Sequence, residues 1–250
     1  MTRAMVTRIP VSAEAGVRSL VNGLLGDGCD VVLISMPFSG DNQLNSIPGV
    51  NRKPGGASYL HAHNEVGRLE TISWTPIFYF IEPVFRAINH ASSLRDYDVV
   101  AMAGKSGGGW STTVAAAFDP RIAHSYAIAG TMPMYLRRIT TSDLGDWEQS
   151  GSSLWSRVDY LDLYLMGALE AGRTADLMWL QHDSCCFQGG RAYGFMPQLI
   201  GFASRMGIAG LSFFVEPNTS MQHAVTPTFV DRVLGDLRER RRRSPNTRRQ

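Results

Sequence analysis

The chain has 250 residues, of which 44% are hydrophobic and 18% charged, the composition of one soluble globular domain of enzyme size. No apolar run reaches the length of a membrane span, and the first residues lack a signal-peptide core, so we expect a cytoplasmic protein with no membrane span. Three cysteines, Cys29, Cys185 and Cys186, are too few for a disulfide framework and lack zinc-site spacing. We expect the adjacent pair to pack as small residues, with a vicinal disulfide as the alternative.

The formal net charge of +2 is distributed unevenly. Residues 238–250 hold seven arginines and one glutamate, so the rest of the chain is weakly acidic. Basic ends can bind nucleic acid or acidic membranes, but no aromatic residues are interleaved in this one. We therefore expect residues 1–237 to form one domain and residues 238–250 to form a disordered tail that does not bind nucleic acid.

The first predicted element is a helix over residues 14–25, where apolar side chains recur at helical spacing. Residues 30–38 follow as a short apolar run, the pattern of a buried parallel strand. Residues 39–64 are rich in Gly, Pro, Asn and Ser, which predicts a long loop. A helix over residues 73–94 comes next, with Pro83 as a kink.

From residue 95 onward, strands and helices continue to alternate. The patterns predict strands over 96–104, 123–130, 175–183 and 209–216, and helices over 110–118, 158–169 and 227–240. This alternation predicts an α/β fold with a mostly parallel sheet and helices on both faces. Functional groups of such sheets lie at the carboxyl ends of strands, which here means the loops after Pro37, Gly104, Gly130, His182 and Glu216.

Two motifs compete for the segment AMAGKSGGGWSTT, residues 101–113. A phosphate-binding loop needs a glycine five positions before Gly104, but Val99 stands there and belongs to the predicted strand. The other glycines follow Lys105 instead of preceding it. Nucleotide binding is therefore disfavoured.

The same segment matches the pattern G-x-S-x-G, placed between a strand and a helix, which is typical of a nucleophile elbow. The turn is expected to strain the backbone of Ser106, and Gly104 and Gly108 supply the small residues that it needs. The N–H group of Gly107 and the start of the following helix are expected to stabilise an oxyanion. The alternative is an unreactive glycine-rich turn.

A serine nucleophile requires a base and a carboxylate that orients it, in the chain order Ser, acid, His. Of six histidines, His182 and His223 follow the elbow at the ends of late strands. We expect a triad of Ser106, Asp183 and His223, with His182 as a structural neighbour. The alternatives are a surface role for His223 and a capping role for Asp183, and Asp176 is a weaker acid candidate.

With these residues placed, the sequence resembles the α/β-hydrolase superfamily, and most of all bacterial serine esterases grouped with acetyl-xylan esterases, dienelactone hydrolases and prolyl-oligopeptidase-like domains. The matching segments are GKSGGGWSTTVAAAFDPRI, HDSCCFQGG and MQHAVTP. The resemblance covers residues 14–236 and implies a serine hydrolase that acts on a small-molecule ester without a metal or another cofactor.

The N-terminus departs from this family, whose members usually begin with further strands. One of them ends in a loop that supplies a second oxyanion N–H group. Only 13 residues, none of them glycine, precede the predicted helix over 14–25, so we expect an N-terminally short fold. The loop after Met36, Pro37 and Phe38 is the nearest candidate region for a substitute donor. Two functions therefore stay open: a serine carboxylesterase, or a truncated, non-catalytic hydrolase-fold protein that acts as a binding module.

Residues 140–173 are expected to form a cap over the pocket. We expect Lys105, Trp147, Trp155 and Tyr160 to contact the substrate, with a place in the helix core as the alternative for the aromatic residues. His61 and His63 have the spacing of metal ligands, but only Glu65 stands near them in the sequence, so we expect them to lie in a rim loop and to bind no metal.

Overall fold

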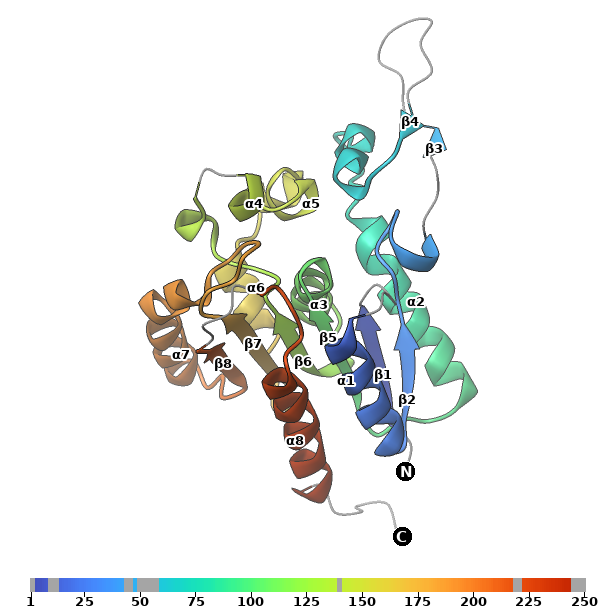
Figure 1. The fold of residues 1–250 in the computed structure, drawn as a ribbon, viewed down its shortest axis with the longest axis vertical. Helices are drawn as coiled ribbons and strands as arrows, with labels where there is room; N and C mark the ends of the chain where they lie inside the picture. The colour runs from blue at the N-terminus through green and yellow to red at the C-terminus, as the bar shows by residue number, and fades with distance from the viewer. Residues whose placement is uncertain are drawn as a thin grey trace, which may run out of the picture.

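The computed structural model describes residues 3–8, 14–42, 47–48, 59–138, 141–217 and 222–243. A six-stranded sheet with the strand order β2-β1-β5-β6-β7-β8 lies at its centre (Figure 1), and all five strand pairs are parallel. Its strands are β1 (Arg3–Arg8), β2 (Cys29–Leu33), β5 (Val100–Lys105), β6 (Ile122–Ile128), β7 (Thr174–Leu180) and β8 (Leu211–Glu216). The predicted parallel α/β sheet is confirmed.

Helices connect these strands. The α-helices are α1 (Ala15–Gly26), α2 (Phe78–Leu94), α3 (Gly107–Phe118), α4 (Thr141–Leu144), α5 (Trp147–Ser150), α6 (Tyr160–Met166), α7 (Met196–Arg205) and α8 (Pro227–Arg243). Short 3-10 helices are η1 (Gly40–Asn42), η2 (His63–Leu69), η3 (Met134–Leu136), η4 (Ser153–Ser156) and η5 (Gly189–Gly194). A separate antiparallel pair joins β3 (Ile47–Pro48) to β4 (Tyr59–Leu60), within the segment predicted as a loop.

The two faces of the sheet are covered by different helices (Figure 1). On one face α1 packs against α8, and Leu20, Phe229 and Val233 have no exposed surface there. The other face carries the larger apolar core, which contains residues of α2, α3, α6 and α7. Trp110 of α3 and Phe80 of α2 meet edge to face in this core, with ring centroids 5.6 Å apart. The prediction that helices cover both faces is confirmed.

The sequence-based expectation that no strand precedes α1 is wrong. β1 lies between β2 and β5, and its last residue, Arg8, is in register with Gly104. Six residues with only three consecutive apolar side chains, Ala4 to Val6, do not stand out as a central strand. Their strand conformation depends on pairing with two neighbours, which local patterns do not reveal. The connection to α1, residues 9–13, lies outside the described residues.

The expected disordered tail is also wrong for residues 238–243, which continue α8. Arg238 pairs with Asp27 at the end of α1, with Nε 2.7 Å from a carboxylate oxygen. Two residues earlier, Asp236 accepts hydrogen bonds from Arg240 and from the buried Tyr126 hydroxyl. Part of the arginine-rich end is therefore paired helix. The rest, residues 244–250, lies outside the described residues. Within the part of the chain that the structure describes, no helix has the length and apolar character needed to cross a membrane.

Candidate active site

Ser106 occupies the turn between β5 and α3. Its backbone has φ 56° and ψ −124°, in the positive-φ region that non-glycine residues rarely adopt. The turn is held on both sides, because Ser106 N donates to Ile128 O at 2.9 Å and Ser106 O accepts from Trp110 N at 2.9 Å. A strained serine between a parallel strand and a helix is the geometry of a nucleophile elbow.

Glycines allow the chain to pass through this turn. A Cβ atom on Gly104 would lie 2.3 Å from the carbonyl oxygen of Gly108, which confirms the need for a small residue at position 104. A Cβ atom on Gly109 would lie 2.7 Å from Ile128 O of the neighbouring strand. Gly109 thus serves close packing of α3 on the sheet.

The N-terminus of α3 begins at Gly107, the expected oxyanion donor. A Cβ atom there would lie 2.3 Å from the sulfur of Met36, so the segment after β2 lies beside the elbow. Phe38, two residues further on, has φ 58°. Any second donor from this segment would have to act next to the thioether side chain.

Asp183 and His223 come together from the ends of β7 and β8. His223 Nδ1 lies 2.8 Å from one carboxylate oxygen of Asp183 and 3.0 Å from the other. The carboxylate is fully buried and also accepts hydrogen bonds from the N–H groups of Cys185 and Cys186. The weaker acid candidate, Asp176, pairs with Arg232 and takes no part in this cluster.

The loop that carries His223 is tied to the elbow through Lys105. Lys105 Nζ donates to the backbone oxygen of His223 at 3.2 Å and to Glu14 Oε2 at 2.8 Å. Glu14 in turn accepts from Val225 N at 2.5 Å. Lys105 and its ion pair with Glu14 thus brace the loop of His223, and the expected contact between Lys105 and a substrate stays a prediction.

The Nε2 atom of His223 faces away from Asp183. It is buried and has no hydrogen-bond partner among the described residues, Ser106 included. The arrangement therefore contains a strained serine and a carboxylate–imidazole pair, with the nitrogen that would accept a proton left available.

Cys185 and Cys186 lie beside this pair as free thiols, with their sulfur atoms 2.7 Å apart. Cys185 is exposed, against the expectation that both cysteines pack as small residues. The hydrogen bond from the Cys186 thiol outweighs burial and lowers the pKa of Cys185 to about 6, with a smaller contribution from His223. The pKa of Cys186 is raised by the same contact. The two sulfurs and a nitrogen of His223 lie within 4.8 Å of one another, so this group has the donor set for a thiophilic metal.

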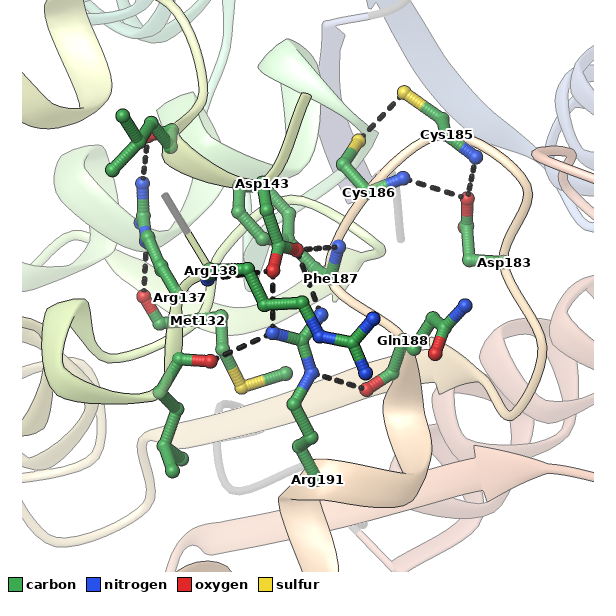
Figure 2. A network of polar contacts seen from close by, with 12 residues as sticks. Met132, Arg137, Arg138, Asp143, Asp183, Cys185, Cys186, Phe187, Gln188 and Arg191 are labelled. Atoms are coloured by element: carbon green, nitrogen blue, oxygen red, sulfur yellow. Dashed lines mark hydrogen bonds and ion pairs between the residues drawn. The ribbon is translucent and has the colours of Figure 1, made fainter. Parts of the chain in front are cut away.

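A second polar network holds the segment that follows Asp183 in the sequence (Figure 2). Asp143 accepts two hydrogen bonds of 2.7 Å from the Arg191 guanidinium, one from Arg138 N and one from Phe187 N. Burial alone would raise the pKa of Asp143, but these hydrogen bonds lower it to about 2. The network joins the segment after β6 to the segment after Asp183. No motif in the sequence marks its members.

Of the three aromatic residues expected in the pocket, one is a core residue, and Trp147 and Trp155 are half-buried against the core. Tyr160 has no exposed surface, and its hydroxyl donates to Gln149 O at 2.8 Å, so its expected contact with a substrate is wrong in this structure. Trp155 stacks on Tyr160 with ring centroids 4.5 Å apart. The guanidinium of Arg137 lies over two aromatic rings, with its Cζ atom 4.5 Å from the centroid of the Tyr160 ring and 4.7 Å from that of the Phe187 ring. The helix-core alternative is confirmed for Tyr160.

Residues 141–166 form α4, α5, η4 and α6 between β6 and β7. In Figure 1, α4 and α5 lie beyond the carboxyl ends of the strands, where a cap is expected. Trp147 at the start of α5 is half-buried, and a Cβ atom on Gly67 would lie 2.4 Å from its ring. This insertion therefore packs against η2, and a role as a cap stays a prediction.

No protein-family model and no curated protein sequence matches the chain. Solved structures do. The methylesterase BT1017 superposes with a TM-score of 0.64 at 13% identity over 95% of this chain, and the chain spans 48% of that protein. A cold-adapted esterase from an Arctic intertidal metagenomic library gives 0.57 at 15% identity, covering 95% of this chain and 82% of that one. Est1E from Butyrivibrio proteoclasticus gives 0.53 at 11% identity, with coverages of 97% and 87%. At such identities the likeness establishes the fold, and the chain has the α/β-hydrolase fold.

Proposed function

We propose that the protein is a serine hydrolase that cleaves a carboxylic ester through an acyl-enzyme on Ser106. The observation that carries the proposal is the strained backbone of Ser106. The preceding residue, Lys105, donates a hydrogen bond to the loop of His223. The esterases among the proteins of similar fold support the choice of an ester substrate. Fold alone would not, because one fold hosts many activities.

The chemistry begins with the tautomer of His223. Its Nδ1–H group donates to Asp183, which leaves the lone pair on Nε2 to accept the proton of Ser106. Ser106 Oγ attacks the ester carbonyl, and the imidazolium then protonates the departing alcohol. Water activated by the same nitrogen releases the acid. The mechanism requires Ser106 Oγ and His223 Nε2 to come into hydrogen-bond contact when the substrate binds, because catalytic hydrogen bonds often tighten only in the complex.

The tetrahedral intermediate carries a negative charge near the N-terminus of α3. The N–H group of Gly107 and the aligned peptide dipoles of the 12-residue helix stabilise that charge. Loss of one such donor costs about 3 kcal/mol of transition-state stabilisation in other hydrolases. A chain with a single effective donor would therefore be a slow but measurable esterase.

The test uses a short-chain nitrophenyl ester and a fluorophosphonate probe. We expect turnover and labelling at Ser106, identified by mass spectrometry of the labelled peptide, and loss of both in Ser106→Ala. Ser184→Ala, which removes an exposed hydroxyl from the residue after Asp183, is the matched control and should retain turnover and labelling. A folded protein that is not labelled at Ser106 would overturn the proposal.

One observation favours a second candidate, a non-catalytic hydrolase-fold module that binds another molecule. His223 Nε2 makes no hydrogen bond to Ser106 in this structure. That candidate predicts no turnover above background and no difference between the parent protein and Ser106→Ala, so the same assays separate the two.

A further inference from the structure

Glu148, the second residue of α5, is buried in an unusual way. Its side chain has no exposed surface, and neither carboxylate oxygen has a hydrogen-bond partner within the described part of the chain. A carboxylate removed from water without hydrogen bonds is strongly destabilising unless a positive charge lies close to it. The position therefore requires a cationic partner.

His63 of η2 and Asp146 just before α5 complete a cluster with Glu148. His63 Nδ1 lies 3.5 Å from Glu148 Oε1, and His63 Nε2 lies 3.6 Å from Asp146 Oδ2. With one atom taken from each side chain, all three lie within 4.8 Å of one another. Two ligands on one tetrahedral metal with bonds of about 2.1 Å stand roughly 3.4 Å apart, so a modest contraction suffices.

The electrostatics of the cluster indicate an excess of negative charge. The carboxylates of Asp146 and Glu148 both face the single imidazole of His63, at 3.6 Å and 3.5 Å. Two carboxylates separated by one residue and placed beside a single imidazole would be better balanced by a doubly charged ion than by one imidazolium.

We propose that His63, Asp146 and Glu148 bind a divalent transition-metal ion. An imidazole with two carboxylates favours Zn²⁺ or Mn²⁺ over Ca²⁺ and Mg²⁺, which prefer oxygen ligands alone. The backbone around the site is already assembled, because Trp147, between the two acids, packs directly on Gly67 of η2. The ion would tie the insertion after β6 to the segment before α2, and it plays no part in the proposed ester chemistry.

Binding is measured on the full chain after dialysis against a chelator. The starting protein carries Cys185→Ser and Cys186→Ser, because these thiols and His223 form a second group with metal-binding geometry among the described residues. Calorimetric titration with Zn²⁺ should show one ion per chain and a rise in Tm. Mn²⁺ should bind more weakly than Zn²⁺, and Ca²⁺ and Mg²⁺ at least tenfold more weakly again. Co²⁺ should give visible absorption bands that Zn²⁺ abolishes.

Two variants test the assignment. Glu148→Gln and His63→Gln should each lower Zn²⁺ affinity about a hundredfold or more and remove the rise in Tm. Glu148→Gln keeps the shape and removes the buried charge, so the metal-free variant should be at least as stable as the metal-free parent. His61→Gln, two residues away and exposed, is the matched control and should bind Zn²⁺ like the parent.

Absence of Zn²⁺ binding to the folded parent would overturn the proposal. So would binding that survives both Glu148→Gln and His63→Gln. Because binding, Tm and the Co²⁺ spectrum are read without any ester, their failure is distinguishable from failure of the proposed hydrolase activity.

Discussion

The nucleophile and the acid–base pair of the proposed site are positioned in different ways. Ser106 depends on its own neighbourhood: one strand, one turn and one helix, with glycines where the backbone must come close. Asp183 and His223 lie outside the regular elements, and their positions depend on contacts with distant parts of the chain. A local turn is either formed or lost with the sheet, whereas the acid–base pair can be loosened while the fold stays intact.

Those distant contacts come from two directions. On one side, Asp143 and Arg191 hold the segment that follows Asp183. On the other side, Lys105 and Glu14 hold the loop of His223 against the elbow. Each pair can be removed without touching a residue of the proposed triad, so the comparison can be tested piece by piece.

The largest effect is expected from Asp183→Asn. The amide oxygen can still accept the N–H groups of Cys185 and Cys186, so the loop and the free energy of unfolding should change little. The amide favours the wrong tautomer of His223, and we expect kcat to fall about 10⁴-fold. The measurement is kcat on a nitrophenyl ester beside a urea unfolding curve.

Asp176→Asn serves as the control for that change. It removes a carboxylate of β7, the strand that leads to Asp183, and this carboxylate pairs with Arg232. The change should cost stability but leave kcat within a few-fold of the parent. Equal kcat in Asp183→Asn and the parent would show that Asp183 does not orient the base.

A smaller effect is expected from Asp143→Asn, which weakens the bidentate pair with Arg191. We expect the free energy of unfolding to fall by about 2 kcal/mol, below the range for fully buried pairs because Arg191 is partly exposed. We also expect kcat to fall about tenfold, because the segment after Asp183 loses an anchor. Asp96→Asn, an exposed carboxylate, is the control.

The pH dependence of this variant has a definite sign. The pKa of Asp143 is held at about 2 in the folded protein, below the unfolded value of about 4. A depressed carboxyl pKa contributes stability that is complete above the unfolded value and is lost as the pH falls towards the folded value. The difference in unfolding free energy between the parent and Asp143→Asn should therefore shrink between about pH 4 and pH 2. A difference that stays constant over that range would contradict the assignment.

The same contrast explains what the sequence could predict. The elbow was predictable because strand pattern, glycines and serine stand together in residues 101–113. Strand-end positions also brought Asp183 and His223 into consideration. β1 was missed because its conformation comes from two partner strands, and Asp143 with Arg191 was missed because the pair joins segments 48 residues apart. The spacing of His61 and His63 is visible in the sequence, but the two acids facing His63 lie more than 80 residues later.

The smallest effect is expected where the two regions touch, at Lys105 and Glu14. Lys105→Met removes the charge beside the elbow and the hydrogen bond to His223 O, and Glu14→Gln keeps an acceptor for Val225 N. The side chains are 15% and 22% exposed, so the coupling between them should be about 1 kcal/mol in a double-mutant cycle. Lys105→Met should lower kcat/KM about fivefold with an almost unchanged Tm. Arg18→Met, an exposed cation of α1, should leave both unchanged. If Lys105→Met instead lowered Tm and left kcat/KM intact, the ion pair would stabilise the fold in general. The position of the loop that carries His223 would then not depend on Lys105.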